Sequence, residues 1–415
     1  MDPSSGISST CLITGKPIQP FVSFGRMPIA NGFLLPEQFK EEYFFDLSVG
    51  FNPESKMVQL IERVDERKMF HENYAFFSST SVYMERHFER FAGFIAENYL
   101  QGVRDPFVME IGSNDGIMLK NFLARNIRHL GIEPSANVAE KAREKGIQTW
   151  SEFFNEKLAE KIRGQFGPAD AVLGANVMCH IPYLHSVFEG VRCLLKPKGI
   201  FAFEDPYLGD IIRKVSYDQI YDEHVFYFSL ASIGYLAEQH GLGVIAVEPQ
   251  NVHGGSMRYI LSHKGSYPAS ESVARQRLEE EKMGLDNIQV FYDFAKNVEK
   301  SKIALMRLLE KLRKQGKSIV GYGATSKSTT VTNYCGITPD LVEFICDTTP
   351  IKQGKFSPGA HIPVRPYAAF AEHYPDYALL FAWNHAAEIM AKEKNFTQAG
   401  GRFILYVPEV AVADP

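Results

Sequence analysis

The chain has 415 residues, of which 45% are hydrophobic and 22% charged, and its formal net charge is −5. That length exceeds what one ordinary hydrophobic core holds, so we expect several domains. The acidic balance argues against a nucleic-acid partner, and no apolar run reaches the roughly 18 residues of a membrane span.

The chain begins Met-Asp-Pro-Ser-Ser-Gly, which lacks the basic start and apolar stretch of a secretory signal. Its 5 cysteines are scattered and include no Cys-x-x-Cys pair. A disulfide framework is therefore not expected, and we expect a cytoplasmic protein.

Three regions follow one another along the chain. Residues 1–85 are rich in turns and short aromatic strands, and residues 86–265 alternate apolar strands with amphipathic helices. Residues 266–415 begin with a charged helix and then repeat the alternation. The alternation predicts an α/β fold with a parallel sheet covered on both faces, followed by a second, smaller open sheet.

The first strand of the middle region, 107–111, runs into a glycine-rich turn. The polar and glycine positions of interest are Glu110, Gly112, Asn114, Gly116 and, at the end of the next strand, Glu133. Glycine lets a ligand approach the backbone closely. Carboxylates disfavour a phosphate but suit a positive sulfonium, and one at a strand end can bind ribose hydroxyls. The turn indicates S-adenosylmethionine (SAM), with other nucleotide folds or a structural turn as alternatives.

Later strand ends carry further polar residues. Asn176 follows the strand 171–173 and would line the methionine side of SAM, although a helix cap is a nearly equal alternative. Tyr221, Glu223 and His224 lie close together after the strand that ends at 204–207. An imidazole titrates near neutral pH, so His224 is our candidate general base, with His180 as a second candidate. An ordinary core or surface histidine is the alternative.

The last region opens with residues 272–314, whose charges have helical spacing and which contain no proline. We expect one long helix linking two domains. A second glycine turn, Gly321–Ser326, follows the strand 318–320, and further strands are expected at 341–345, 377–381 and 402–406. This turn offers backbone N–H groups to an anion at a helix N-terminus, with a purely structural turn as the alternative.

Motifs across almost the whole chain resemble the sugar C-methyltransferase family, and are similar to those of the tetronitrose-pathway C-3 methyltransferase. They are Glu110–Leu119, Cys179–Pro182, Glu204–Asp210, Tyr221–His224, His253–Gly255, Gly321–Lys327, Asp347–Pro350, Pro358–Val364 and Phe381–His385. The resemblance implies a class I SAM methyltransferase core between a zinc-ribbon-like N-terminal domain and a Rossmann-like C-terminal domain. It also implies SAM as cofactor and a dTDP-linked 4-keto-6-deoxy sugar, possibly 2,6-dideoxy, as substrate, with a GDP-linked sugar as the alternative.

The chain departs from the family where two Cys-x-x-Cys pairs normally hold zinc. The corresponding positions are Cys11, Thr14, Asn52 and Ser55. Because threonine, asparagine and serine are poor zinc ligands, we expect that the metal has been lost and that the N-terminal domain is degenerate.

The resemblance further implies a mechanism. A 4-keto group makes the hydrogen at C3 removable, and the enolate then attacks the methyl group of SAM. His224 would be the base, His180 or Tyr221 would stabilise the enolate oxygen, and Glu223 would position the sugar. Candidate contacts to the sugar nucleotide are Tyr74, Ser78, Tyr207, His253, Ser326, Lys327, Asp347, Lys352 and Asn384.

Three rival functions remain open at the level of sequence. A NAD-dependent sugar-nucleotide oxidoreductase could use the second glycine turn, but it leaves the first turn and the segment 221–224 without a role. A non-catalytic sugar-nucleotide-binding protein would not need the retained acid, base and SAM residues. The third rival is an enzyme that methylates a sugar hydroxyl. Such an enzyme would not exchange the hydrogen at C3 with solvent. We expect a monomer.

Overall fold

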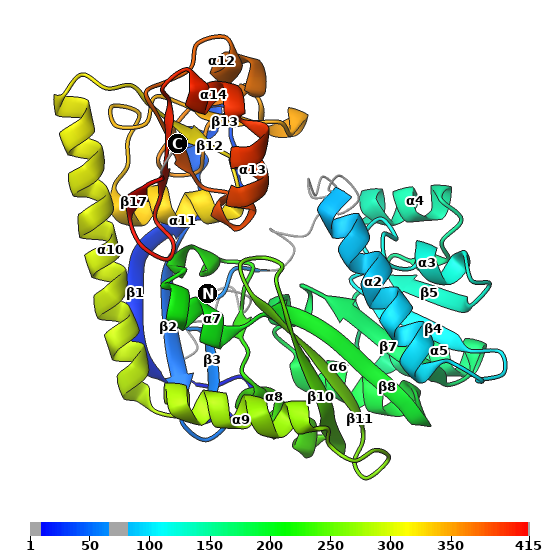
Figure 1. Cartoon of the computed structure of the whole chain (residues 1–415). Helices are drawn as coiled ribbons and strands as arrows, with labels where there is room; N and C mark the ends of the chain where they lie inside the picture. The colour runs from blue at the N-terminus through cyan, green and yellow to red at the C-terminus, as the bar shows by residue number, and fades with distance from the viewer. Residues whose placement is uncertain (1–9, 66–81, 414–415) are drawn as a thin grey trace.

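The computed structural model of the chain describes residues 10–65 and 82–413, so the predicted sugar contacts Tyr74 and Ser78 lie outside the described residues. Three β-sheets organise these ranges (Figure 1). No helix within them combines the length and the apolar character that crossing a bilayer demands.

The first sheet is antiparallel and forms most of the N-terminal part. It contains β1 (Gln19–Pro28), β2 (Phe44–Asn52), β3 (Met57–Leu60) and β9 (Phe226–Tyr227), in that order, with the 3-10 turn η1 (Pro36–Glu41) between β1 and β2. The strand β9 comes from the middle of the chain, so the sheet is completed only by a distant segment. Phe24, Phe45 and Phe51 are buried in this part, as the aromatic strands predict.

The central sheet has seven strands in the order β10-β11-β8-β7-β4-β5-β6. They are β4 (Phe107–Ile111), β5 (Arg128–Ile132), β6 (Thr149–Trp150), β7 (Ala169–Ala175), β8 (Leu195–Pro206), β10 (Leu242–Gln250) and β11 (Ser256–His263). The strands from β8 to β6 are parallel, as expected. The expectation of a wholly parallel sheet is wrong at one edge, because β10 and β11 form a hairpin antiparallel to β8.

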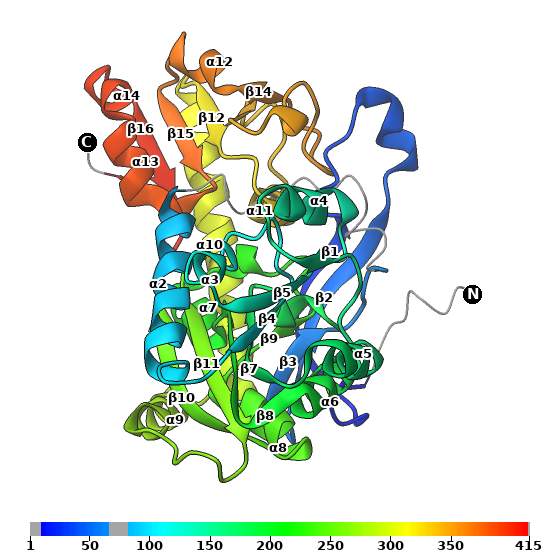
Figure 2. The ribbon, with the colours of Figure 1, turned by 90° about the vertical axis from the view of Figure 1, so that its right-hand side faces the viewer.

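Helices cover both faces of this sheet (Figure 2). On one face lie α5 (Glu156–Phe166), α6 (Leu184–Leu194) and α8 (Leu230–Gln239), and on the other lie α2 (Val82–Tyr99), α3 (Lys120–Leu123) and α4 (Ala136–Glu144). Side chains cap two of them: Asn155 accepts the Leu158 N–H at 3.0 Å, and Ser229 accepts the Ser232 N–H at 3.1 Å. The remaining short elements here are η3 (Met178–His180), α7 (Leu208–Lys214) and η4 (Tyr217–Gln219).

The predicted single long helix at 272–314 is in fact two helices, α9 (Glu271–Met283) and α10 (Ile288–Lys314). Gly284 ends α9 in the left-handed region with φ of 70°, and the side chain of Asn287 caps α10 by accepting the Gln289 N–H at 3.0 Å. A glycine C-terminal cap and an asparagine N-terminal cap three residues apart therefore break the helical pattern.

The third sheet has six strands in the order β14-β13-β12-β15-β16-β17. Its elements are β12 (Ile319–Tyr322), α11 (Ser326–Cys335), β13 (Ile345–Asp347), η5 (Pro350–Lys352), β14 (Val364–Pro366), α12 (Tyr367–Ala371), β15 (Tyr377–Leu380), η6 (Trp383–His385), α13 (Ala386–Lys392), α14 (Lys394–Gln398), β16 (Arg402–Leu405) and β17 (Ala411–Val412). The strand expected at 341–345 begins only at Ile345, because the backbone N–H groups of Leu341 and Val342 both donate to Thr338 in a turn.

The helix α10 joins the first and third sheets into one hydrophobic core. Phe291 of α10 stacks 5.0 Å from Phe21 of β1, and it lies 4.8 Å from Phe51 of β2. Farther along the helix, Leu305 and Leu309 pack in the same cluster as Ile319 of β12. The N-terminal and C-terminal parts are therefore held together along one side of the molecule (Figure 1).

Candidate active site

The glycine turn after β4 is shaped by packing within the protein. Gly112 and Gly116 have φ of 65° and 79°, in the region that favours glycine. A Cβ at Gly112 would lie 2.6 Å from Val177, and one at Gly116 would lie 2.8 Å from Ile147. The missing side chains thus admit neighbouring segments of the chain, and they bring the loop after β7 against the turn.

Two buried carboxylates face this turn. Glu133 accepts the backbone N–H of Asn114 at 3.0 Å and that of Ser135 at 2.8 Å, one on each oxygen. Glu110 is 2% exposed, and its Oε2 has no hydrogen-bond partner among the described residues. Burial, together with the neighbouring carboxylates, raises the pKa of Glu110 well above its usual value. An unsatisfied buried acceptor beside a strand end fits a ligand that carries positive charge and hydroxyl donors, as SAM does.

The loop after β7 meets the β10–β11 hairpin at Asn176. Asn176 and His253 both have positive φ, 50° and 53°, which is strained for residues other than glycine. The Asn176 amide nitrogen contacts His253 Nε2, while its Oδ1 is buried without a hydrogen-bond partner among the described residues. Burial and the nearby Lys327 lower the pKa of His253 to about 3, so its ring is a neutral acceptor. The helix-cap alternative for Asn176 is not what the structure forms.

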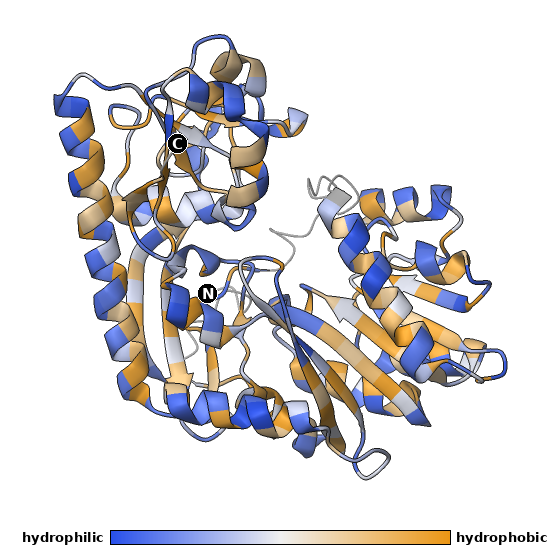
Figure 3. Ribbon diagram, in the orientation of Figure 1, coloured by the Kyte–Doolittle hydropathy of each residue, from blue (hydrophilic) through white to orange (hydrophobic). Residues whose placement is uncertain are grey.

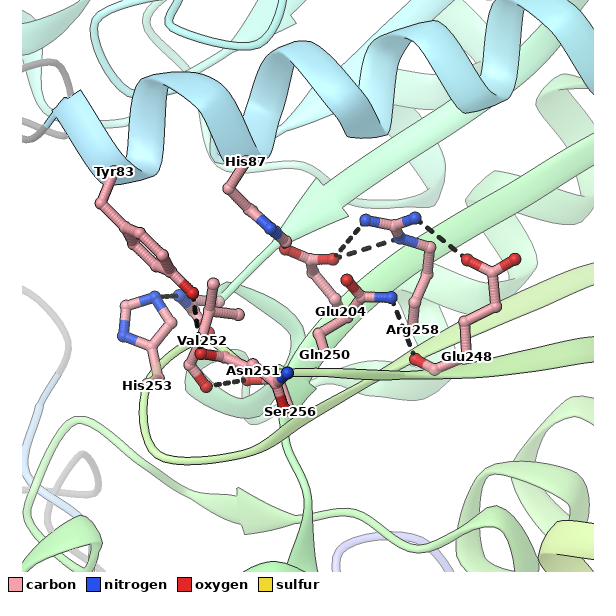
Figure 4. A network of polar contacts seen from close by, with 11 residues as sticks. Tyr83, His87, Glu204, Glu248, Gln250, Asn251, Val252, His253, Ser256 and Arg258 are labelled. Atoms are coloured by element: carbon pink, nitrogen blue, oxygen red, sulfur yellow. Dashed lines mark hydrogen bonds and ion pairs between the residues drawn. The ribbon is translucent and has the colours of Figure 1, made fainter. Parts of the chain in front are cut away.

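A buried ionic network fixes the strand end beside Asn176 (Figure 4). Arg258 of β11 donates to Glu204 of β8 at 3.0 and 3.1 Å and to Glu248 of β10 at 3.1 Å. His87 of α2 contacts the other oxygen of Glu204. The backbone oxygen of Glu204 accepts the Asn176 N–H at 2.7 Å. Sequence reasoning missed this network, because its members are far apart in the chain and form no motif.

His224 is held in one tautomer by its two neighbours. Its Nδ1 lies 2.8 Å from the Gln219 carbonyl, which can only accept, so Nδ1 carries the proton. Its Nε2 then presents a lone pair, which accepts from the Tyr221 hydroxyl at 2.9 Å. Burial and the nearby His180 ring lower the pKa of His224 well below its ordinary value. The imidazole is therefore a neutral, oriented base at physiological pH.

His180 and the thiol of Cys179 lie next to this base. The rings of His180 and His224 have centroids 5.2 Å apart, and burial lowers the pKa of His180 to about 4. Ligand atoms of Cys179, His180 and His224 lie within 4.8 Å of one another. Burial raises the pKa of the Cys179 thiol, which disfavours the thiolate that a metal would need. This donor set therefore suits proton transfer better than metal ligation.

Glu223 receives a partner that sequence reasoning missed. Asn31, just after β1, donates to its carboxylate at 2.6 Å. A single asparagine in a turn forms no motif, so the sequence gave no signal for this contact. The structure thus brings His180, Tyr221, Glu223 and His224 into one cluster with a contribution from the N-terminal part.

The predicted sugar-nucleotide contacts in the C-terminal part form two groups, one around Lys327 and one at the second glycine turn. Lys327 donates to Asn384 at 3.3 Å and to the His253 carbonyl at 3.5 Å, which joins three of the predicted sugar-nucleotide contacts. Asp347 was expected at a ribose, but its oxygens accept the backbone N–H groups of Ala324 and Thr349, both at 2.7 Å. It therefore shapes the second glycine turn, where Ser326 begins α11 and Lys352 donates to the Ala324 carbonyl at 2.8 Å.

Tyr207 does not join either group. Its hydroxyl donates to Glu280 at 3.1 Å and accepts from Gln276 at 2.7 Å, both on α9. Its ring fills the space beside Gly209, where a Cβ would lie 2.3 Å from it. The structure therefore uses the predicted sugar contact Tyr207 to dock α9 on the central sheet.

Three of the four former zinc positions, Cys11, Asn52 and Ser55, lie in contact, and their side chains are linked by polar contacts. The Cys11 thiol lies 3.4 Å from the Ser55 hydroxyl, which donates to Asn52 Oδ1 at 2.9 Å. The Asn52 amide donates to the Pro17 carbonyl at 3.1 Å, and Thr14 Oγ1 accepts the Lys16 N–H at 3.2 Å. One thiol with two neutral oxygen side chains does not fit a zinc ion.

Comparison with known proteins covers most of the chain. Family models described as "Putative zinc binding domain", "Methyltransferase domain" and "C-methyltransferase C-terminal domain" match residues 11–70, 83–247 and 251–408. The C-methyltransferase NovU from Streptomyces niveus is 34% identical over 394 residues, which are 94% of this chain and 93% of the relative.

Solved structures of methyltransferases match less than half of the chain. The CcbJ methyltransferase from Streptomyces caelestis has 14% identity and a TM-score of 0.33, over 42% of this chain and 89% of that chain. The magnesium protoporphyrin IX methyltransferase ChlM from Synechocystis PCC 6803, with bound SAM, has 12% identity and a TM-score of 0.33, over 48% of this chain and 89% of that chain.

The likeness to NovU is not confined to the SAM-binding sheet, because it runs through the N-terminal and C-terminal parts that complete the cluster around His224. The fold is that of a class I SAM methyltransferase core with two added domains. The chain is an enzyme and belongs to the family of SAM-dependent C-methyltransferases.

Proposed function

We propose that the enzyme methylates C3 of a dTDP-linked 4-keto-6-deoxy sugar, possibly a 2,6-dideoxy sugar, in deoxysugar biosynthesis, with His224 as the base. The observation that carries the proposal is the locked tautomer of His224. A neutral Nε2 lone pair beside a tyrosine hydroxyl can remove a proton from carbon only if the resulting charge is delocalised, and a neighbouring ketone provides that.

The proposed step begins when the C3–H bond breaks and its proton moves to His224 Nε2. The electron pair left at C3 is delocalised onto the 4-keto oxygen as an enolate. SAM, when bound, supplies a methyl group whose bond to sulfur breaks as its bond to C3 forms, leaving S-adenosylhomocysteine. Tyr221 and His180, which lie beside His224, are our candidate donors for the enolate oxygen.

The residues around the first glycine turn would hold SAM. Glu133, at the end of β5, keeps lone pairs for the ribose hydroxyls, and the buried oxygen of Glu110 suits the positive end of the molecule. Asn176 and its unpartnered amide oxygen lie between this turn and the cluster around His224.

The nucleotide would lie on the C-terminal side. Lys327 is buried beneath Trp383, with its ammonium 5.0 Å from the ring centroid, and Ser326 begins a helix whose first N–H groups favour an anion. We further propose that the enzyme works as a monomer in the cytoplasm, since one chain supplies every group named here.

Product analysis tests the proposal. The enzyme would be incubated with SAM and a panel of dTDP- and GDP-linked 4-keto sugars in D2O, and the products analysed by mass spectrometry and NMR. We expect methylation at C3 of a dTDP sugar and, before SAM is added, deuterium at C3 that is absent with His224→Gln. Methylation on oxygen, or no wash-in with a sugar that is turned over, would reject the mechanism. Tight NADH binding without SAM binding would favour the oxidoreductase.

A further inference from the structure

Two adjacent carboxyl groups, Asp222 and Glu223, are buried beside the proposed base, and they are treated differently by their surroundings. They are 1% and 4% exposed. Two like charges so close cannot both be ionised at low cost, so the environment must choose which one keeps its proton.

Asp222 has few partners for a negative charge. Its Oδ1 accepts the Ala30 N–H at 2.9 Å, and its Oδ2 is buried without a hydrogen-bond partner among the described residues. Burial and the neighbouring Glu223 raise the pKa of Asp222 to about 8. Asp222 is thus the member of the pair that carries a proton at neutral pH.

Glu223 instead receives a hydrogen bond from an amide of the N-terminal part and is influenced by a positive charge from the C-terminal part. Asn31 donates to it at 2.6 Å. Burial raises the pKa of Glu223, and the Asn31 hydrogen bond and then the positive charge of Lys352, on η5, both oppose that rise. The ionised form of Glu223 is therefore supported by both neighbours.

Both neighbours are themselves held in place. Ala30, next to Asn31, accepts a hydrogen bond from the Thr329 hydroxyl of α11 at 2.8 Å. Lys352 donates to the Ala324 carbonyl at 2.8 Å, and its ammonium lies 4.9 Å from the Phe33 ring centroid. Lys352 is thus part of the contact between the N-terminal and C-terminal parts.

We propose that Asn31 and Lys352 are positioning residues that hold the Glu223 carboxylate ionised and in place beside His224. The inference rests on the proposed function, in which Glu223 accepts a hydroxyl of the sugar. An ionised carboxylate accepts on both oxygens, whereas a protonated one would turn a donor toward the same hydroxyl. The degenerate N-terminal domain is thereby a working part of the active centre.

The test compares Lys352→Met and Lys352→Arg with Lys355→Met, which removes one charge from the same loop at a partly exposed position. Loss of the Lys352 charge should raise the pKa of Glu223, so the acid limb of kcat/KM should move to higher pH. The KM for the sugar nucleotide should rise about tenfold, the scale of one charge-assisted hydrogen bond. The affinity for SAM should stay unchanged. The variant Lys352→Arg should keep the acid limb of kcat/KM at the wild-type pH.

The titratable groups nearest Glu223 are Asp222 and His224 on its own segment, Cys179 from η3 and Lys352 from η5. Of these, only Lys352 is changed. Asn31→Asp, which replaces the donor with a like charge, should shift the limb in the same direction. If Asn31→Asp does not fold, the Lys352 pair alone decides the matter.

Three results would overturn the inference. They are a wild-type pH profile in Lys352→Met, a higher KM with no shift of the limb, as for a phosphate contact, and loss of SAM affinity together with turnover. The variant Glu223→Gln distinguishes a failure of the proposed function from a failure of the present inference. If it turns over normally, the sugar-positioning role in the proposed function fails. If it is impaired while Lys352→Met and Asn31→Asp behave like wild type, only the present inference fails.

Discussion

At the scale of single residues, His224 is the proposed base because its two hydrogen-bond partners fix which ring nitrogen carries the proton. Replacing it with glutamine keeps a polar group of similar size but removes the base. We expect turnover to fall by about 100-fold or more, the usual contribution of a general base, while SAM binding measured by calorimetry stays near wild type. Near-native turnover would remove His224 from this role.

Buried neutral histidines also make the fold sensitive to acid. Burial lowers the pKa of His180 to about 4 and of His253 to about 3, whereas an unfolded chain protonates near 6.5. Between these values the unfolded state binds more protons, so stability is complete above pH 6.5 and declines as the pH falls below it. Thermal melts from pH 7 to pH 4 should show this decline, and His253→Gln should flatten it. A decline of equal slope in His253→Gln would contradict the prediction.

How far the sequence predicts the site depends on whether a residue belongs to a local pattern. Glu110, His224 and Lys327 lie in short motifs at strand ends or helix starts, where the chemistry is visible in neighbouring letters. Asn31 and Arg258 have no such context, since their partners are about 190 and 50 residues away, at Glu223 and Glu204. Asp347 and Tyr207 had the right residue type, but backbone N–H groups and Glu280 engage them.

At the scale of elements, the break between α9 and α10 depends on one backbone conformation. Gly284 has φ of 70° and open space around its Cβ position, so Gly284→Ala adds strain without a clash. We expect a loss of about 1 kcal/mol in the free energy of urea unfolding. Gly164, inside α5 with open space around it, is the matched control, and Gly164→Ala should stabilise by about 0.5 kcal/mol. Equal effects at both sites would refute the explanation.

The helical spacing through 272–314 could not reveal this break, because one glycine costs a helix little and the charges continue on both sides of it. The caps decide it, since Asn287 and Gly284 favour two ends over a continuous helix. Figure 3 shows hydrophilic and hydrophobic residues alternating along α10, which is the pattern that buries one face against the first sheet.

The two segments at the former zinc positions, 11–14 and 52–55, lead to a prediction about zinc binding. The contacts among Cys11, Asn52 and Ser55 replace metal bonds with hydrogen bonds, so a chelator should not change the melting temperature. Combining Thr14→Cys, Asn52→Cys and Ser55→Cys should create a site that binds one zinc ion per chain, measured by elemental analysis. In that variant the melting temperature should fall when the chelator is added. Stoichiometric zinc in the unaltered protein would overturn our assignment.

At the scale of the whole molecule, the first and third sheets share a core through α10. Phe291 is fully buried between Phe21 and Phe51. Phe291→Ala should cost about 3–5 kcal/mol and lower the unfolding midpoint of both parts together. Tyr292→Ala, on the exposed face of the same helix, is the control and should cost less than 1 kcal/mol. Separate transitions for the two parts would contradict a shared core.

The pairing of β3 with β9 has a consequence for synthesis on the ribosome. On the side of β3 that faces away from β2, Val58 and Gln59 pair with Tyr227 and Phe226, so this edge must wait until more than half of the polypeptide has emerged. An open strand edge is a site of misassociation, which makes nascent chains of intermediate length the ones most in need of chaperone protection. The same event anchors the segment just before β9, so the base at position 224 is set in place at the moment the nascent sheet closes.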